Sequence, residues 1–412
     1  MLTLVTMLRV WLGVRHATFV GAHRDKVPAE FSTRVSLVEH QRAADYTRAK
    51  TTLGLVDVGI DAGLLLALTL GGLLHLIDQH LTALTGKSHL HGLALFAAAG
   101  VISFVVGLPT SLYRTFRVES RFGFNKITPV LWLVDLAKGT ALAIVIGAPL
   151  LLGVLWLMDA MGEHWWFFVW IAWLGFNLLV LFLYPTVIAP LFNKFSPLDD
   201  ASLKTRIEAL LSRCGFSLSG VFVMDGSKRS SHGNAYFTGF GRNKRVVFFD
   251  TLLQTLVPGE IEAVLAHELG HFKHRHVVKR MASMAVLTLG FLWLLAQLMT
   301  QRWFFNGLGV SEPGTAMALL LFSLTLPVFL FPLTPLTSGL SRKHEYEADA
   351  YAASQTDANG LISALVKLYR DNAATLTPDP LHSLFHDSHP SAAARIAHLL
   401  AIQIPSKASP SS

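Results

Sequence analysis

The stretch Trp165–Ile188 reads WWFFVWIAWLGFNLLVLFLYPTVI and contains no charged residue. A membrane-spanning helix needs roughly 20 mostly apolar residues, so this stretch is long enough to cross a bilayer. The chain is therefore predicted to be a mainly α, polytopic membrane protein. Further apolar stretches lie near Ala62–Ile77, Gly92–Leu112, Gly139–Met158, Met281–Thr300 and Gly314–Leu336. The first of these is somewhat short, and Leu53–Gly59 can extend it.

The composition supports this prediction. Of the 412 residues, 52% are hydrophobic and only 15% are charged, whereas soluble domains carry about 25% charged residues. A single cysteine, Cys214, excludes an intramolecular disulfide framework and a zinc cluster made of cysteines alone. The net charge of +7 does not indicate a nucleic-acid partner, because basic loops in membrane proteins set their orientation.

The first residues form a seventh candidate span. Met1–Val20 is apolar but is interrupted by Arg9 and Arg15, and we expect a short transmembrane helix, with an interfacial helix as the alternative. Lysine and arginine are frequent in residues 24–50 and 114–138 and almost absent from the alternate connections. Because basic loops face the cytoplasm, residues 189–280 and 341–412 are predicted to be cytoplasmic.

The predicted organisation has four parts. Residues 1–188 hold transmembrane helices 1–5, residues 189–280 form a small cytoplasmic α+β domain, residues 281–340 hold helices 6–7, and residues 341–412 form a cytoplasmic helical region. Apolar periodicity and β-rich runs give the elements of the α+β domain. They are helices over Asp199–Cys214 and Pro258–His274, strands over Val221–Met224 and Arg245–Phe249, and a strand-like segment over His232–Phe240.

The helix predicted over Pro258–His274 contains His267-Glu268-Leu269-Gly270-His271. Residues four apart lie on one helical face, so both histidines can bind one zinc ion at roughly 2.0–2.1 Å. Glu268 follows the first histidine and can take a proton from a water bound to that ion. The motif predicts a hydrolytic site with one Zn²⁺ per chain.

A catalytic zinc usually has a third protein ligand. His274 and His276 are near the motif but stand among basic residues, and we expect them to form a solvated or membrane-interfacial end. Glu345 and Asp349 are four apart, so Glu345 can bind zinc while Asp349 accepts the second N–H of a ligand imidazole. Glu347 falls on another face and is expected to point elsewhere. A surface charge pair is the alternative that this pattern leaves open.

Longer motifs give the chain a family resemblance. They are Ala43–Thr47 (AADYT), Arg121–Lys126 (RFGFNK), Pro190–Phe195 (PLFNKF), Asp225–Phe237 (DGSKRSSHGNAYF), His267–His271 (HELGH), Glu345–Asp349 (EYEAD) and Asp387–Pro390 (DSHP). Together they resemble the type I CAAX prenyl endoproteases, which are integral-membrane zinc metallopeptidases, and in particular bacterial members. The zinc motif is widely shared, and the runs at Arg121–Lys126 and Asp225–Phe237 are more specific.

The resemblance implies a fold and a set of site residues. The fold is a bundle of about seven transmembrane helices that encloses a chamber, with the zinc site facing inward. The implied residues are the zinc ligands His267, His271 and Glu345, the catalytic base Glu268, Asp349 orienting a ligand histidine, His389 stabilising the oxyanion with Arg395 supporting it, and Asn234, Ala235 and Tyr236 binding the substrate backbone as a strand edge.

The predicted function is hydrolysis of membrane-associated or C-terminal, CAAX-like peptide segments, with or without a prenyl group. The predicted partners are a peptide or protein substrate and the lipid bilayer, and the predicted location is a bacterial inner membrane. One alternative is a quality-control peptidase resembling the heat-shock membrane zinc protease, which is not expected to match Arg121–Lys126. A remote alternative is a metal transporter, which needs ionisable residues at the centres of its spans. The span centres of this chain are nearly free of such residues. Asp135 and Lys138 lie near the start of a span and are expected to pair at the membrane interface.

Overall fold

Long apolar helices dominate the structure. The computed structural model describes residues 1–86, 88–216, 220–238 and 245–403. Among these residues, six helical stretches are long and apolar enough to cross a membrane, which confirms a polytopic, mainly α membrane protein. They are Leu37–Leu68, His89–Glu119, Pro129–Ala160, Gly162–Phe192, His276–Leu298 and Thr315–Gln355.

The N-terminal half consists of helices. Its elements are α1 (Leu2–Ala22), η1 (Ala29–Phe31), α2 (Leu37–Leu68), α3 (Leu73–Thr85), α4 (His89–Tyr113), η2 (Arg114–Glu119), α5 (Pro129–Leu142), η3 (Ala143–Gly147), α6 (Ala148–Ala160), η4 (Gly162–His164), α7 (Trp165–Leu183), η5 (Tyr184–Ile188) and α8 (Ala189–Phe192). The first expected span is a continuous helix, α1, which packs along α2 although it is not one of the six stretches.

The second expected span has the wrong bounds. The stretch Ala62–Ile77 is broken, because α2 ends at Leu68 and α3 begins at Leu73 as a separate helix. Two consecutive glycines cause the break: Gly72 has φ +75°, and a Cβ on Gly71 would lie 2.8 Å from the Ala67 carbonyl oxygen. The membrane-crossing helix includes the expected extension Leu53–Gly59 and continues toward the N-terminus as far as Leu37.

The C-terminal half combines a small sheet with helices. Its elements are β1 (Phe195–Pro197), α9 (Ala201–Arg213), β2 (Gly220–Met224), η6 (Gly226–Lys228), β3 (Ala235–Thr238), β4 (Arg245–Phe249), α10 (Asp250–Thr255), α11 (Pro258–Lys273), α12 (His276–Leu298), α13 (Arg302–Asn306), α14 (Thr315–Leu330), η7 (Phe331–Leu333), α15 (Thr334–Gln355), α16 (Ala358–Asp371), α17 (Pro380–His386) and α18 (Ala392–Gln403).

The sheet has the strand order β1-β2-β4-β3. β2 and β4 are parallel, whereas β1 and β3 are antiparallel edge strands. The helices and strands expected in this segment are present, and the segment expected over His232–Phe240 is a strand over Ala235–Thr238; residues 239–240 lie outside the described residues. One hydrophobic core joins the sheet to α9, α11, α16 and α18, so residues 189–280 and 341–403 fold together.

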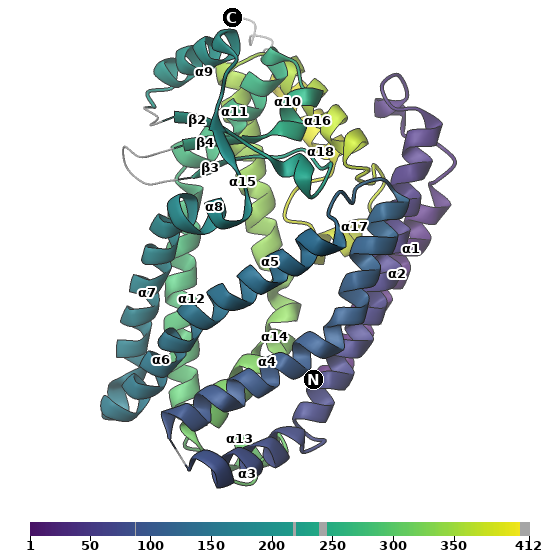
Figure 1. Ribbon diagram of the computed structural model, residues 1–412. Helices are drawn as coiled ribbons and strands as arrows, with labels where there is room; N and C mark the ends of the chain where they lie inside the picture. The colour runs from purple at the N-terminus through teal and green to yellow at the C-terminus, as the bar shows by residue number, and fades with distance from the viewer. Residues whose placement is uncertain (87, 217–219, 239–244, 404–412) are drawn as a thin grey trace, which may run out of the picture.

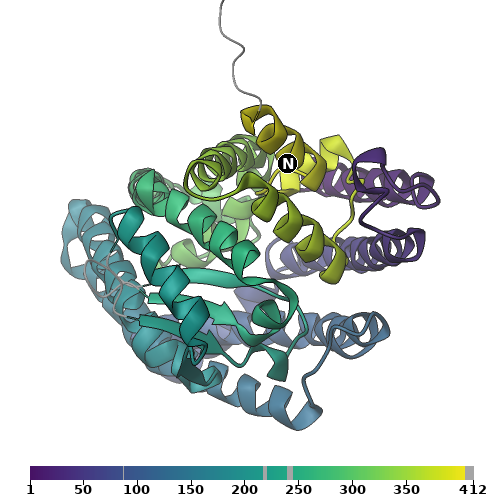
Figure 2. The ribbon, with the colours of Figure 1, turned by 90° about the horizontal axis from the view of Figure 1, so that it is seen from above.

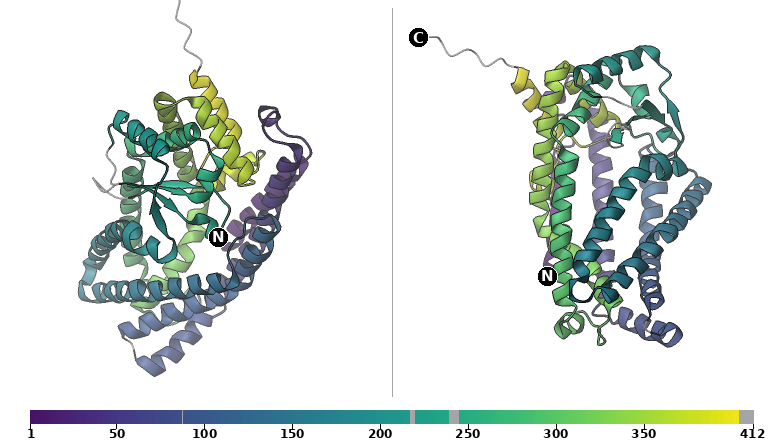
Figure 3. Two further views of the ribbon diagram at one scale, coloured as in Figure 1. Left: turned by 45° about the horizontal axis from the view of Figure 1, so that its top comes forward. Right: turned by 90° about the vertical axis from the view of Figure 1, so that its left-hand side faces the viewer.

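The α+β part lies at one end of the long helices, and α3 and α13 lie at the other end (Figures 1 and 3). Seen from above, α1 and α2 lie side by side at the edge, with the C-terminal helices between them and the sheet (Figure 2). α17 packs against α1, and α16 packs against α2. The first helices and the last helices of the chain therefore brace each other beside the α+β part.

Two of the longer motifs meet at the junction between the membrane helices and the sheet. Arg121–Lys126 and Asp225–Phe237 are joined by an isolated antiparallel bridge. Arg229 donates two hydrogen bonds of 2.8 Å to the carboxylate of Asp135 on α5. The expected pair of Asp135 with Lys138 is wrong, because Lys138 donates to a main-chain carbonyl instead.

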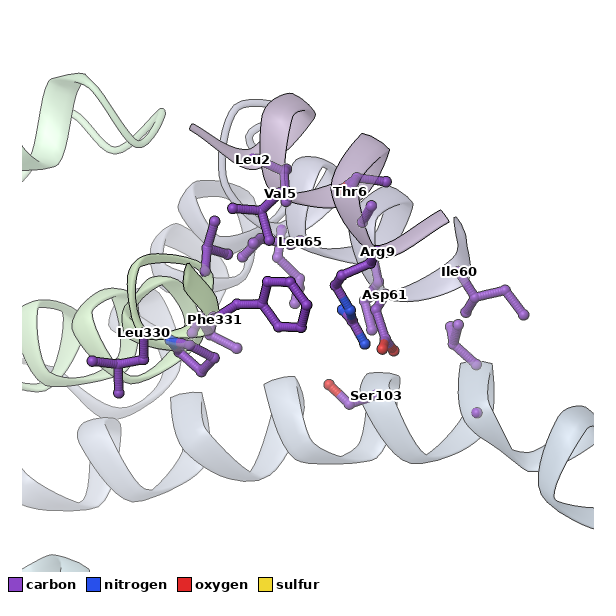
Figure 4. Close-up of a pocket in the computed structure, with 18 of the residues that line it drawn as sticks. Leu2, Val5, Thr6, Arg9, Ile60, Asp61, Leu65, Ser103, Leu330 and Phe331 are labelled. Atoms are coloured by element: carbon purple, nitrogen blue, oxygen red, sulfur yellow. The ribbon is translucent and has the colours of Figure 1, made fainter. Parts of the chain in front are cut away.

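A cavity of about 610 Å³ lies among α1, α2, α4 and the end of α14. Its lining is mainly apolar, but the side chains of Arg9 and Asp61 project into it, with Ser103 opposite (Figure 4). Two ionisable side chains, Arg9 and Asp61, therefore line this cavity, which reaches the start of α15 at Thr334.

Candidate metal centre

Helix α11 carries the HELGH motif, and its N-terminus is fixed by a buried carboxylate. Pro258 occupies the first turn, where a missing N–H costs nothing. Glu260 accepts a hydrogen bond of 2.9 Å from the Val257 amide and others from Ser363 and Lys367 on α16. These bonds hold the position of α11 against α16, which lies in the same hydrophobic core.

Helix α15 crosses α11 at close range. Gly270 permits this approach, because a Cβ there would lie only 2.8 Å from the Ala348 Cα and 3.0 Å from the Ala348 carbonyl oxygen. Ala348 and Ala352 are fully buried at the contact. Small residues on both helices therefore place Glu345 directly beside the two histidines of the motif.

Three side chains from these helices point their ligand atoms at one another. His267 Nε2 and His271 Nε2 are 3.2 Å apart. Glu345 Oε2 lies 3.5 Å from His267 Nε2, and Glu345 Oε1 lies 3.4 Å from His271 Nε2. The structure thus brings together the two motif histidines and the glutamate 74 residues beyond the second of them.

This triangle fits a zinc ion. A tetrahedral ion about 2.1 Å from each ligand separates the ligand atoms by about 3.4 Å, and the three observed separations lie between 3.2 and 3.5 Å. Glu345 is 5% exposed. Its buried Oε2 faces His267 Nε2 and Arg395 Nη1 at 3.5 Å each but makes no hydrogen bond with a described residue. A bound cation would give this oxygen the close partner that it lacks.

The outer nitrogen of His267 is held by a buried ion pair. His267 Nδ1 lies 2.8 Å from Asp349 Oδ1, and Asp349 is fully buried. Arg395 on α18 donates its Nε–H to Asp349 Oδ2 at 2.8 Å and a second N–H to Oδ1. The Asp349 carboxylate therefore fixes the tautomer of His267 and anchors α18 to the site.

Burial changes the pKa of both Glu268 and His271. Glu268 makes no hydrogen bond or ion pair with a described residue, and burial raises the pKa of its carboxyl. A base with a raised pKa can both take and return a proton near neutral pH. Burial, together with the nearby His267, lowers the pKa of His271 to about 4, so its Nε2 lone pair is available to a metal.

His389 completes the ring of groups around Glu345. Its Nε2 lies 3.4 Å from Glu345 Oε1, its Nδ1 is paired with the Ser388 hydroxyl at 2.9 Å, and its side chain is 59% exposed. It stands three residues before α18, the helix that carries Arg395. An exposed N–H donor beside the three ligands can reach a substrate oxygen there.

The predicted substrate-binding residues lie on the edge of the sheet. Ala235 and Tyr236 belong to β3, which has β4 as its one partner strand among the described residues, and Asn234 precedes them. The ring of Phe237 packs on Phe272 of α11, with 5.0 Å between centroids. This contact links the edge strand to the helix that carries the motif.

A second group of side chains lies behind His271 and did not follow from the sequence. His276 was expected in a solvated basic end, but it is 4% exposed and its Nδ1 lies 3.0 Å from His271 Nδ1. Glu347 is not one of the three ligands of the triangle, and its Oε2 lies 2.8 Å from His276 Nε2. A histidine so close to a zinc motif is a candidate for a role in the site. The direction of its side chain, however, depends on the turn between α11 and α12.

Comparisons with known proteins agree with this geometry. The family described as CAAX prenyl protease N-terminal, five membrane helices, matches residues 16–194, and peptidase family M48 matches residues 197–403. The CAAX prenyl protease 1 homolog of Arabidopsis thaliana is 40% identical over 73% of this chain and 71% of its own length. The Homo sapiens homolog is 34% identical over 72% of this chain and 71% of its own.

The fold matches a solved structure. The crystal structure of S. mikatae Ste24p superposes with a TM-score of 0.89 at 31% identity and covers 96% of both chains. Its membrane helices surround a chamber, so the expected fold class is confirmed. The chain belongs to peptidase family M48, in its CAAX prenyl protease branch, and is a multi-pass membrane zinc metallopeptidase.

Proposed function

We propose that the protein cleaves CAAX-type C-terminal segments of membrane-associated proteins at the site formed by His267, His271 and Glu345. The observation that carries this proposal is the triangle of ligand atoms, with separations of 3.2–3.5 Å, beside an unpaired Glu268. The names of the relatives, CAAX prenyl protease 1, support the substrate class. One zinc ion per chain accounts for the site.

The side chains suit peptide hydrolysis. Zinc held by the three ligands would polarise the scissile carbonyl and lower the pKa of the attacking water. Glu268 takes the proton of that water and then passes it to the leaving amine, which a carboxyl of raised pKa can do. His389 donates an N–H to the oxygen that becomes negative in the transition state. Arg395 supports the site through Asp349, to which it donates two hydrogen bonds, and through Glu345, whose Oε2 lies 3.5 Å from its Nη1.

The edge strand β3 supports a binding mode. Its unpaired side can accept an extended peptide as an added strand, whose main-chain hydrogen bonds give affinity without strict side-chain selection. Asn234, Ala235 and Tyr236 form the start of this edge. Because Phe237 contacts Phe272 of α11, a peptide on this strand runs beside the helix that carries Glu268.

The cavity of Figure 4 supports binding of a prenyl chain. It is about 610 Å³ in volume, mainly apolar, and includes Thr334, the first residue of α15. Glu345 follows eleven residues later on the same helix, about 16 Å away at about 1.5 Å per residue. A lipid attached next to the scissile bond can extend from the zinc site toward this cavity.

Cleavage of two matched peptides by detergent-purified protein tests the function. One peptide carries a farnesyl group near its C-terminus and the other does not, with Glu268→Gln and a zinc-chelated sample as controls. We expect preferred cleavage of the farnesylated peptide, and loss of cleavage in both controls. Leu65→Trp, which fills the cavity, should reduce that preference and spare the unmodified peptide. Equal cleavage of both peptides would favour general membrane quality control, and an active Glu268→Gln variant would refute the catalytic assignment.

We also propose that the α+β part faces the cytoplasm, in a bacterial inner membrane. The basic segments 24–50 and 114–138 contact this part through the Glu39–Arg370 and Asp135–Arg229 pairs, and basic segments face the cytoplasm. A membrane-impermeant maleimide tests the orientation in a Cys214→Ser background. It should label Ser212→Cys only in inverted vesicles, and Leu84→Cys, at the opposite end, only in intact spheroplasts. The reverse pattern would refute the orientation.

A further inference from the structure

The ligand His271 is held from behind by a chain of two hydrogen bonds. Its Nδ1 lies 3.0 Å from His276 Nδ1, and His276 Nε2 lies 2.8 Å from Glu347 Oε2. Glu347 belongs to α15, two residues after the third ligand, Glu345. The same helix therefore supplies one zinc ligand directly and reaches a second ligand through His276.

An unusual turn aims His276 at His271. In a continuous helix, residues five apart do not face each other. Here α11 ends at Lys273, Arg275 takes a left-handed conformation with φ 55° and ψ 35°, and α12 begins at His276. The His276 ring is then enclosed between the rings of His344, at 4.0 Å, and His274, at 5.5 Å. A non-glycine residue in this conformation is uncommon, which indicates a turn imposed by its surroundings.

One assignment of protons satisfies both hydrogen bonds. The Nε2 of His271 faces the other two ligands, so a metal there takes its lone pair and leaves the N–H on Nδ1. That N–H donates to His276 Nδ1, and the N–H of His276 must then lie on Nε2, where it donates to the Glu347 carboxylate. We propose that His276 and Glu347 are positioning residues, which fix the ring orientation of His271 and strengthen its bond to zinc.

The same groups could be read as a second metal site. His276, His344 and Glu347 have ligand atoms within 4.8 Å of one another. The proton assignment argues against this reading, because the His276 nitrogen that faces Glu347 carries a hydrogen whenever His271 binds zinc. The structure therefore assigns these groups to the support of the first site.

Zinc affinity tests the proposal independently of activity. The apo-protein in detergent is titrated with zinc against a competing chelator, and its metal stoichiometry is measured. Loss of a residue that holds the outer nitrogen of a ligand histidine typically weakens metal binding about 10–100-fold. We expect a loss in this range for His276→Ala, and a loss near its lower end for Glu347→Ala. Glu347→Gln keeps an acceptor oxygen and should recover most of the affinity. Two control variants should bind zinc as the wild type does. Lys343→Ala removes a neighbour of Glu347 that takes no part in the hydrogen bonds from His271 to Glu347, and Arg275→Gly keeps the left-handed turn.

Two further measurements separate positioning from a general structural role. Visible absorption of the cobalt-substituted protein should change in Glu347→Ala and return in Glu347→Gln, while the thermal midpoint of apo Glu347→Ala should match that of the apo wild type. Wild-type zinc affinity in both His276→Ala and Glu347→Ala would overturn the proposal. A stoichiometry of two zinc ions per chain, falling to one in Glu347→Ala, would overturn it in favour of a second metal site.

Discussion

Arg395→Met should destabilise the α+β part strongly, because it removes the buried partner of Asp349. The Asp349 carboxylate accepts three N–H groups, one from His267 and two from Arg395, and it is fully buried. The variant removes two of the three. At about 1.5–3 kcal/mol for each charge-assisted bond the loss is about 3–6 kcal/mol. That range agrees with the roughly 3–5 kcal/mol found when one partner of a buried ion pair is removed.

The assay is denaturant unfolding of the detergent-solubilised apo-protein, followed by near-ultraviolet circular dichroism. Arg370→Met is the matched control, because Arg370 is 34% exposed and pairs with Asp371 and Glu39 near the surface. Exposed pairs contribute about 0–1 kcal/mol, so this control should unfold almost as the wild type does. If Arg395→Met unfolded within about 1 kcal/mol of Arg370→Met, the reasoning about the buried carboxylate would be wrong.

Three other changes test the site. Burial opposes the charged form of His267, yet the nearby carboxylates of Asp349 and Glu345 raise its pKa to about 9. Below that pH zinc must displace a proton, so zinc affinity of the apo-protein should rise about tenfold per pH unit from about pH 6 to 8 in calorimetric titrations; a flat profile would contradict the assignment. His389→Ala should lower kcat about 10²–10³-fold with zinc content unchanged, if its N–H stabilises the oxyanion; an unchanged kcat would exclude that role. Gly270→Ala places a Cβ 2.8 Å from the Ala348 Cα and should cost about 1–3 kcal/mol in denaturant unfolding and weaken zinc binding, whereas Gly175→Ala, with open space around it, should do neither.

The parts of the site that the sequence could predict depend on helical spacing. His267 and His271 lie four residues apart on one helix, as do Glu345 and Asp349, and the structure places all four side chains together. Spacing within one helix does not depend on how that helix packs against others, so it can be predicted without knowing the packing. The contact between α11 and α15 did not follow from this spacing. Its local indication in the sequence is a small residue on each helix, Gly270 and Ala348, and these two face each other in the structure.

The residues that could not be predicted depend on turns and on long-range contacts. His276 faces His271 only because Arg275 adopts a left-handed conformation. Non-glycine residues rarely adopt this conformation, so the sequence offered no reason to expect it. Asp135 pairs with Arg229 across 94 residues rather than with Lys138 on its own helix, and nothing local favours that choice. The break after α2 is different, since the pair Gly71–Gly72 was a readable helix-stop signal.

The helical stretch Thr315–Gln355 runs from the membrane to the zinc ligand without an intervening loop. A tilt of this stretch in the membrane is therefore transmitted to Glu345, near its polar end. A 5° change in the tilt of the segment from Thr334 to Glu345 would displace the carboxylate by about 1.4 Å, on a length of about 16 Å. Metal ligands tolerate only about 0.5 Å of misplacement. A lipid or detergent that tilts this stretch would therefore move a zinc ligand by more than the site tolerates. We expect the zinc affinity and activity of purified samples to vary with the lipid or detergent used.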